Sequence, residues 1–286
     1  MNNRKLAIQI HDDLVPLGDA EFRYIADMLY TRFGIHLSDQ KRILVAGRLT
    51  KRLRQLGFSS FKTYIEYLSA DTSGSELSEL INRITTNHTF FFREREHFDF
   101  LEKTVLPGIA KQAVPGYPLR IWSAGCASGE EVYSTAMLLR SYYEQGVNIP
   151  DIGLLATDIS LEALNNAQTG IYANARLEEL PDKYRTRWFT RSGTDSWSIH
   201  PEIKKMVLFK RLNLMADRYP MKGQFDVIFC RNVMIYFDQD SRERVVNSLY
   251  AYLKTGGYLF IGHSESLRRD TCPFEYIKPA IYRKGA

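Results

Sequence analysis

The sequence predicts an α/β fold, with a Rossmann-like domain built on a parallel sheet and a small all-α domain before it. Three observations support this prediction. Apolar residues recur at helical spacing up to about residue 85, strand-like and helix-like segments alternate from Leu119 onward, and a glycine-containing turn follows the first of those strands. We place the domains at 15–86 and 119–286, joined by a linker and helix at 87–118.

Four short helices are predicted in the first domain. Phe22, Ile25 and Leu29 lie at helical spacing, and Gly34 ends that segment. Residues 39–56 form a second amphipathic segment, and two more follow before residue 85. The predicted helix starts are Asp19, Ser38, Ser59 and Ser75.

The second domain is predicted from alternating segments. A helix at 95–111 precedes strands at 119–124, 152–157, 225–230 and 257–262, with helices at 129–144, 160–168 and 241–253. Segments 274–278 and 280–283 are predicted to form an antiparallel pair at one sheet edge.

Between 171 and 212 the alternation of strands and helices stops. Short strand-like pieces there, including 206–209, are predicted to form a small antiparallel β insertion at about 185–211.

Composition and charge restrict the class of protein. No apolar run approaches the roughly 20 residues that span a bilayer, and no signal peptide is recognisable, so membrane insertion is not expected. The three cysteines are far apart and show no metal-ligand spacing, so we expect reduced thiols, a cytoplasmic protein and no metal.

The positive charge of the chain is concentrated in one segment. The net charge is +5, and residues 41–54 hold six cations and no acid, which predicts an acidic partner. On that helix Lys41, Arg48 and Arg52 are predicted to share a face turned away from the apolar stripe.

The loop after the first predicted strand indicates the kind of ligand. Gly125 and Gly129 permit backbone angles closed to other residues, so a ligand can approach the main chain. Glu130 and Glu131 then begin the next helix, where a dinucleotide-binding loop would leave the N-terminus bare for a pyrophosphate. Two carboxylates repel phosphate. The loop therefore favours a ligand with ribose hydroxyls and a positive charge, such as S-adenosylmethionine; an ordinary turn with capping acids is the alternative.

Further polar residues follow other predicted strands. Asp158 ends the second strand, where a carboxylate can accept both ribose hydroxyls; a helix cap is its alternative role. Asn213 follows a strand-like segment and could reach an adenine edge, although a loop asparagine more often bonds its own backbone. Arg231, Asn232 and Tyr236 follow a buried strand, at the sheet edge where ligands collect.

Four segments, in this order, resemble the chemotaxis receptor methyltransferase (CheR) family. They are 85–93 (TTNHTFFFR), 123–131 (SAGCASGEE), 230–237 (CRNVMIYF) and 260–266 (FIGHSES), and the similarity extends from about 17 to 284. The resemblance implies a class I S-adenosylmethionine-dependent methyltransferase that methylates glutamate side chains in the cytoplasmic signalling domain of chemoreceptors. The products would be glutamate methyl esters, formed in chemotactic adaptation, and S-adenosylhomocysteine.

The resemblance also implies site residues. Arg93 and Tyr236 match the pair that the family places near the transferred methyl group, and the basic helix, with Lys41, Arg48 and Arg52, matches the element thought to face the receptor. The positions that match the family's cofactor pocket are Asn87, Thr89, Arg93, Glu130, Asp158, Asn213, Leu214, Cys230, Arg231 and Asn232.

One departure from the family concerns receptor tethering. Some members bind a pentapeptide at the receptor C-terminus through the β insertion. From Arg191 to Asn213 this chain is a few residues shorter than those members and lacks their glycine-rich spacing. We therefore predict a pentapeptide-independent enzyme, and we expect a monomer.

Three other functions are open to this sequence. A nucleic-acid methyltransferase would suit the basic helix, but the residues after the strand at 225–230 lack the proline pair of amino-directed DNA enzymes. A serine hydrolase built on Ser264 would need the second glycine of a nucleophile elbow, which is missing. A receptor-binding adaptor without turnover would not need Arg93, Glu130, Asp158 and Tyr236 together.

Overall fold

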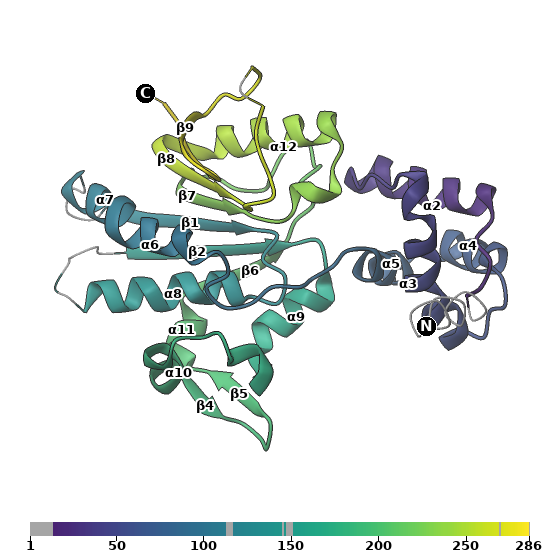
Figure 1. Ribbon diagram of the computed structural model, residues 1–286, viewed down its shortest axis with the longest axis horizontal. Helices are drawn as coiled ribbons and strands as arrows, with labels where there is room; N and C mark the ends of the chain where they lie inside the picture. The colour runs from purple at the N-terminus through teal and green to yellow at the C-terminus, as the bar shows by residue number, and fades with distance from the viewer. Residues whose placement is uncertain (1–13, 113–116, 145, 147–150, 269, 286) are drawn as a thin grey trace, which may run out of the picture. The chain divides into compact units, whose positions relative to one another are not determined.

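The computed structural model describes residues 14–112, 117–144, 146, 151–268 and 270–285, and these form two units (Figure 1). The first unit holds the described residues up to Thr86 together with Tyr236–Asp238. The second holds the described residues of 87–235 and 239–285. Among the described residues, no helix is both long enough and apolar enough to cross a bilayer.

The first unit is helical, as the apolar spacing predicts. Phe22, Ile25 and Leu49 are among its buried apolar residues. The helical elements are α2 (Asp19–Phe33), the 3₁₀ turn η1 (Asp39–Lys41), α3 (Arg42–Gln55), α4 (Phe61–Ala70) and α5 (Ser75–Ile84). Gly34, with φ 68°, ends the helix α2. The Ser60 hydroxyl accepts the Thr63 N–H at the start of the helix α4.

The prediction that the cations of α3 face away from the helical core is wrong for Arg48 and Arg52. The Arg48 guanidinium donates to the Ile84 carbonyl and, at 2.6 Å, to the Thr86 hydroxyl. Arg52 pairs with Glu76 of α5, which is only 1% exposed. Helical spacing groups residues on one face, but it does not show whether a cation on that face has a buried partner on a neighbouring helix.

Glu76 is held by three donors from two helices. Its carboxylate accepts Arg52 Nε at 3.1 Å, Arg52 Nη2 at 2.5 Å and the Tyr64 hydroxyl at 3.0 Å. Burial and the neighbouring carboxylate raise the pKa of Tyr64 far above its ordinary value. A buried carboxylate is tolerated only with such partners, so this group fixes how α3, α4 and α5 pack.

The second unit is built on a seven-stranded sheet of order β6-β2-β1-β7-β8-β10-β9. The first five strands are parallel, and β10 runs antiparallel to both neighbours, which confirms the Rossmann-like fold and the predicted antiparallel pair. The strands are β1 (Pro118–Ala124), β2 (Asp151–Asp158), β6 (Val207–Arg211), β7 (Phe225–Cys230), β8 (Leu253–Ile261), β9 (Glu275–Lys278) and β10 (Ile281–Arg283).

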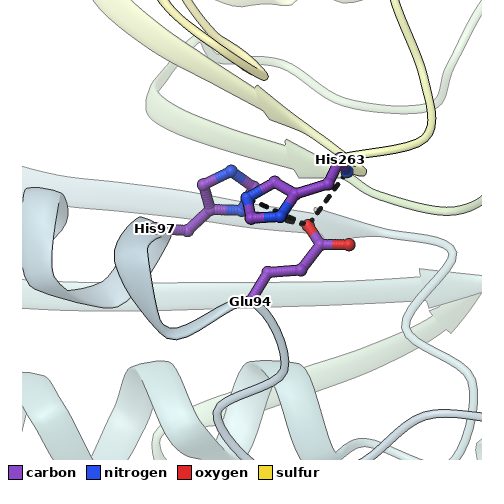
Figure 2. A group of neighbouring side chains, drawn as sticks. All are labelled: Glu94, His97 and His263. Atoms are coloured by element: carbon purple, nitrogen blue, oxygen red, sulfur yellow. Dashed lines mark hydrogen bonds and ion pairs between the residues drawn. The ribbon is translucent and has the colours of Figure 1, made fainter.

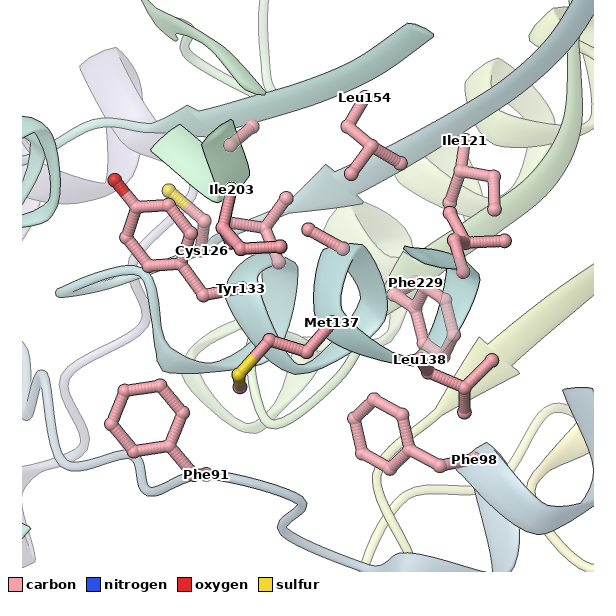
Figure 3. Packing of buried hydrophobic residues seen from close by; sticks show 14 of the residues in the cluster. Phe91, Phe98, Ile121, Cys126, Tyr133, Met137, Leu138, Leu154, Ile203 and Phe229 are labelled. Atoms are coloured by element: carbon pink, nitrogen blue, oxygen red, sulfur yellow. The ribbon is translucent and has the colours of Figure 1, made fainter. Parts of the chain in front are cut away.

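Helices cover both faces of this sheet. Phe98, Met137 and Leu138 pack with Leu154 and Phe229 on one face (Figure 3). On the other face Trp122 contacts Tyr219, which stacks on Tyr252. The helical elements are α6 (Arg95–Phe100), the π-helical turn η2 (Leu101–Val105), α7 (Leu106–Gln112), α8 (Glu130–Tyr143), α9 (Leu161–Thr169), η3 (Asn174–Leu177), α10 (Asp182–Trp188), α11 (Pro201–Lys205), α12 (Gln239–Tyr252) and η4 (Met234–Tyr236), whose last residue groups with the first unit.

The β insertion differs from its prediction. Residues 206–209 were assigned to it, but β6 pairs in parallel with β2 and is an edge strand of the main sheet. The small sheet has the order β3-β5-β4 and takes its remaining strand from Ile171–Ala173. Its strands are β3 (Ile171–Ala173), β4 (Phe189–Arg191) and β5 (Ser196–Ile199). An edge strand with one covered face alternates in hydropathy like an insertion strand, so hydropathy did not separate them.

Replacing Arg52 by methionine tests the internal role of this arginine. Arg52→Met leaves the Glu76 carboxylate buried without its cation, and we expect a loss of about 3–5 kcal/mol in unfolding free energy. Lys51→Met, one position earlier on the same helix and exposed, is the matched control and should change stability by less than about 0.5 kcal/mol. Urea denaturation followed by circular dichroism measures both. Equal stability of the two variants would contradict the internal role.

Candidate functional site

The glycine loop between β1 and α8 is held against the end of β2. The main-chain N–H groups of Gly125 and Cys126 both donate to the Thr157 carbonyl, at 2.7 and 2.9 Å. The Ala127 N–H donates to Asp158 Oδ2 at 2.8 Å. Three backbone donors of the loop are thus satisfied by the last two residues of one strand, so these hydrogen bonds attach the loop to the end of β2.

Two positions in this loop require glycine. Gly125 has φ 82° and Gly129 has φ 94°, a region that strains other residues. A Cβ on Gly125 would lie 2.3 Å from Val233 Cγ2, and one on Gly129 would lie 2.9 Å from Ala167 Cβ. Backbone angle and space therefore both exclude a side chain at these positions.

Glu130 begins α8 and is fully buried. Its carboxylate accepts the Ser128 hydroxyl at 2.7 Å and forms a 3.3 Å ion pair with Arg176. Burial raises the pKa of Glu130, while the Ser128 hydrogen bond and Arg176 act in the opposite direction. Arg176 also donates to the Thr89 carbonyl at 2.8 Å, so it connects this acid to the segment before α6.

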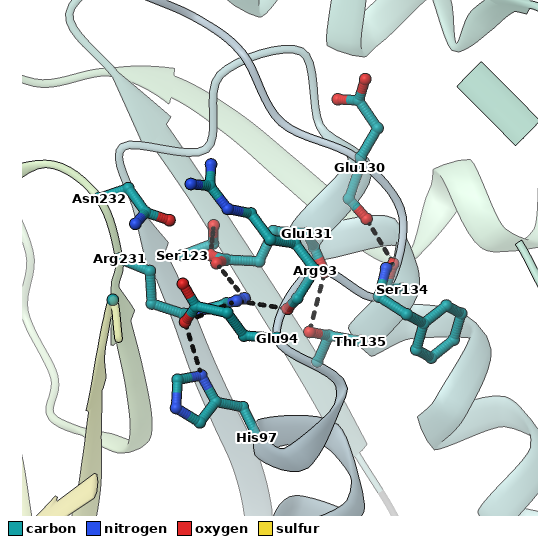
Figure 4. A network of polar contacts seen from close by, with 12 residues as sticks. Arg93, Glu94, His97, Ser123, Glu130, Glu131, Ser134, Thr135, Arg231 and Asn232 are labelled. Atoms are coloured by element: carbon teal, nitrogen blue, oxygen red, sulfur yellow. Dashed lines mark hydrogen bonds and ion pairs between the residues drawn. The ribbon is translucent and has the colours of Figure 1, made fainter. Parts of the chain in front are cut away.

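Glu131 points elsewhere and belongs to a buried ionic network (Figure 4). Arg231, 5% exposed, lies between two acids, with Nη1 3.0 Å from Glu131 and Nη2 3.2 Å from Glu94. Arg231 also donates to the Arg93 carbonyl, and the Ser123 hydroxyl donates to Glu131 at 2.7 Å. Burial raises the pKa of Glu131, and Arg231 lowers it.

This network changes the interpretation of Arg231 and adds Glu94 to the site. Arg231 was expected in the cofactor pocket, but its guanidinium is committed to Glu94, Glu131 and a main-chain carbonyl. Sequence reasoning missed Glu94 as its partner. The available signal was a buried arginine after a strand, which requires acids nearby.

Both carboxylate oxygens of Asp158 accept hydrogen bonds from main-chain N–H groups. Oδ2 receives the loop N–H described above, and Oδ1 accepts the Ser160 N–H at 2.9 Å. The cap of α9 is the Ser160 hydroxyl, which accepts the Ala163 N–H at 2.9 Å, so Ser160 takes the capping role weighed for Asp158. Burial raises the pKa of Asp158, and its backbone donors lower it. Each carboxylate oxygen has a second lone pair, so the group retains acceptor capacity.

The loop after β6 holds two more of the predicted residues. Asn213 Oδ1 accepts the Met215 N–H at 3.0 Å, which is the local bond weighed as its alternative role. The Leu214 carbonyl accepts the Tyr219 hydroxyl at 2.8 Å. Both residues therefore lie in a turn that their own hydrogen bonds shape.

The last residue of β7 and the segment after it hold two more of the predicted residues. Cys230 ends the strand and is fully buried, and burial raises the pKa of its thiol well above the ordinary value. Asn232 has φ 59°, and its N–H donates to Glu265 Oε2 at 2.9 Å. Glu265, which also accepts the Gly262 N–H at 2.6 Å, was not singled out from the sequence. It belongs to the GHSES segment, whose polar residues directly after a buried strand were the available signal.

The segment 87–93 carries Asn87, Thr89 and Arg93. Asn87 is partly exposed and Thr89 is 9% exposed. Arg93 Nη1 donates to the His88 carbonyl at 3.0 Å, and the guanidinium lies 5.7 Å from the Phe90 ring centroid. Among the described residues Arg93 forms no ion pair with an acid, so its charge is not neutralised by a carboxylate of the chain.

Tyr236 groups with the helical unit. Its hydroxyl accepts the Thr86 N–H at 2.8 Å and donates to the Thr86 carbonyl at 3.2 Å. Its own carbonyl accepts the His36 N–H at 2.8 Å. Thr86 thus fixes the direction of the phenol oxygen.

The loop, Glu130 and Asp158 together suit a nucleoside that carries a positive charge and no phosphate. Both acids are buried, and both contact the same glycine loop through Ser128 and Ala127. A carboxylate accepts hydrogen bonds from ribose hydroxyls and attracts a sulfonium or ammonium group, whereas it repels a phosphate. S-adenosylmethionine combines these features, so the donor set fits that cofactor.

A methyl group added at Gly125 tests the loop. Gly125→Ala combines backbone strain of about 1–2 kcal/mol with overpacking of about 1–3 kcal/mol. Gly256→Ala is the matched control, because Gly256 also has positive φ but its added Cβ would meet only the Arg283 side chain, at 3.3 Å. We expect Gly125→Ala to lower the unfolding free energy more than the control does, measured by urea denaturation. A smaller loss at Gly125 would contradict the crowding.

Comparisons with known proteins agree with this chemistry. Residues 87–282 match the family described as "CheR methyltransferase, SAM binding domain", and residues 20–85 match "CheR methyltransferase, all-alpha domain". The chain is 44% identical over 267 residues to a chemotaxis protein methyltransferase of Borreliella burgdorferi, covering 93% of this chain and 94% of that protein. It is 40% identical over 265 residues to the chemotaxis protein methyltransferase of Escherichia coli K12, covering 91% and 89%.

The similarity to solved structures is weaker than the similarity to these two relatives. The N-methyltransferase NodS from Bradyrhizobium japonicum, in complex with S-adenosylhomocysteine, shares 17% identity and a TM-score of 0.33, over 59% of this chain and 60% of that chain. The two family matches divide the chain between residues 85 and 87 and together cover most of it. The chain therefore belongs to the CheR methyltransferase family and carries its S-adenosylmethionine-binding domain.

Proposed function

We propose that this protein methylates glutamate side-chain carboxylates in the cytoplasmic signalling domain of chemoreceptors, giving glutamate methyl esters. The observation that supports it most is the glycine loop with Glu130 and Asp158 buried against it, in a chain of this family. Incubation with radiolabelled S-adenosylmethionine and receptor-bearing membranes tests the proposal. Base-labile label on receptor protein is expected, and label on nucleic acid would contradict it.

Two acids, Asp158 and Glu130, are proposed to be the main ligands of the cofactor. Asp158 would accept the ribose hydroxyls, and Glu130 would face the positively charged part of the ligand. Asn87, Thr89, Asn213, Leu214, Cys230 and Asn232 would complete the walls of the pocket. S-adenosylmethionine supplies an electrophilic methyl group when bound. Arg231 would not touch the cofactor. Its contacts would instead hold the Arg93 main chain, Glu94 and Glu131 in position.

The proposed substrate needs no general base. A glutamate side chain has an ordinary pKa of about 4.3 and is already a carboxylate at neutral pH. The chain's residues therefore have to position the carboxylate, keep water out and avoid holding it too tightly.

Arg93 and Tyr236 are proposed to do this positioning. The Arg93 guanidinium is charged and forms no ion pair with a described acid, so it can attract an anionic side chain. The Tyr236 hydroxyl is oriented by Thr86. Neither residue is proposed to transfer a proton.

The receptor-facing surface is proposed to be the basic helix, with a changed set of residues. Arg48 and Arg52 act within the helical unit. We propose that Lys41, in the turn η1 just before α3, and the exposed Lys51 of α3 contact an acidic receptor surface. We further propose that the enzyme acts without a receptor pentapeptide, as a cytoplasmic monomer, on protein and not on nucleic acid. Equal methylation of receptors with and without their last five residues would support the first of these points.

Neutralising either pocket acid tests the cofactor site. Asp158→Asn and Glu130→Gln each remove a charged acceptor, so we expect affinity for S-adenosylhomocysteine to fall by about 10–100-fold, which corresponds to a charged hydrogen bond. Calorimetric titration measures the affinity, and circular dichroism checks folding. Glu178→Gln, an exposed acid of the same unit, is the control and should bind normally. Wild-type affinity in both pocket variants would exclude the proposed site.

Replacing Tyr236 and Arg93 separates positioning from proton transfer. We expect Tyr236→Phe to lower kcat about tenfold, as for one lost hydrogen bond. Arg93→Met should lower kcat about a hundredfold through misplacement of the substrate. The pH–rate profile should keep its shape in both variants. Tyr67→Phe, an exposed tyrosine of the helical unit, should not change the rate. A shifted profile in Tyr236→Phe would indicate that this residue carries a proton.

A further inference from the structure

Glu94, His97 and His263 form a cluster that the methyltransferase site does not use. Glu94 immediately precedes α6, His97 lies in the first turn of that helix, and His263 follows β8 (Figure 2). His97 Nδ1 lies 3.5 Å and His263 Nε2 lies 3.9 Å from the same Glu94 oxygen. One potential ligand atom from each residue lies within 4.8 Å of the others.

His97 is the most unusual member of this cluster. It is 1% exposed, and neither ring nitrogen has a hydrogen-bond partner among the residues that the structure describes. A buried polar group without a partner costs about 1–3 kcal/mol, so it needs a physical reason. In Figure 2 the ring is directed toward the Glu94 carboxylate.

The backbone at Glu94 is held in an uncommon conformation. Its φ is 56°, in the left-handed region, which costs a residue other than glycine about 1–3 kcal/mol. The contacts that hold its carboxylate include Arg231 at 3.2 Å and the His263 main-chain N–H at 3.2 Å. These contacts hold the Glu94 carboxylate beside the two histidines.

We propose that Glu94, His97 and His263 form a binding site for a first-row transition-metal ion such as Zn²⁺. Two imidazoles and one carboxylate are a ligand set that zinc uses, with bonds of about 2.0–2.2 Å. Such bonds place ligand atoms about 3.4 Å apart in a tetrahedron. The pair His97–Glu94 already has this spacing, at 3.5 Å. His263, whose side chain is 45% exposed, has room to move closer and leaves a path from solvent.

Two neighbouring cations oppose the ion and limit its affinity. Arg231 Nη2 contacts the same Glu94 oxygen, and Lys278 is close enough to influence His97. When Glu94 binds an ion, Arg231 keeps its 3.0 Å pair with Glu131, so its charge does not lose its remaining partner. The bound ion would connect the start of α6 to the loop after β8, and thereby stabilise the folded state by mass action.

Zinc titration of the tag-free full chain tests this site. Calorimetry is expected to give one Zn²⁺ per wild-type chain, and zinc is expected to raise Tm. His263→Ala and His97→Leu should each weaken binding by at least about tenfold, since even the loss of an outer partner of a metal ligand costs about 10–100-fold. His36→Ala, which removes an exposed histidine of the helical unit, is the control and should bind zinc like the wild type.

The leucine variant also separates a folding defect from a lost ligand. Without zinc, His97→Leu replaces a buried group that lacks partners with an apolar one, so its Tm should equal or exceed that of the wild type. Its Tm should then not respond to zinc. No zinc binding by the wild type, or equal binding by the wild type, His263→Ala and His97→Leu, would overturn the proposal.

Discussion

The ion pairs of Arg231 are the interaction on which the rest of the methyltransferase unit depends. One buried guanidinium at the end of β7 contacts Glu94 before α6, Glu131 at the start of α8 and the Arg93 carbonyl. These elements come from distant parts of the chain. A buried charge with two opposite charges is stable only while its partners remain in place, so the three segments fold as one arrangement or leave an uncompensated charge.

This network divides the acids of the site into two groups. Glu94 and Glu131 balance Arg231 and are structural, whereas Glu130 and Asp158 contact the glycine loop and are the proposed ligands of the cofactor. Adjacent residues in sequence thus have different tasks, because successive positions on a helix point in different directions. Glu131 faces the sheet, and Glu130 faces the loop and Arg176.

The helical unit shows the same principle with cations. A run of basic residues predicts an acidic partner outside the unit. In the structure two of these residues bind partners within the unit: Arg52 pairs with Glu76, and Arg48 donates to the Ile84 carbonyl at the end of α5. Arg48 and Arg52, which the sequence assigned to a receptor-facing surface, therefore have partners within the helical unit itself. A mutation of Arg52 that weakens receptor methylation would act through the fold of the unit.

The sequence by itself located most of the helices and strands and indicated the kind of ligand. Apolar spacing located α2 to α5, the alternation located β1, β2, β7 and α8, and Gly125, Gly129 and Glu130 indicated a nucleoside without phosphate. Only the tertiary structure decided that β6 joins the main sheet, that Arg52 and Arg231 are buried ion-pair partners, and that His263 lies beside Glu94 and His97. The physical reason is that helix and strand periodicity depends on neighbouring residues, whereas the partner of a buried charge is set by which distant segments the packed core brings together.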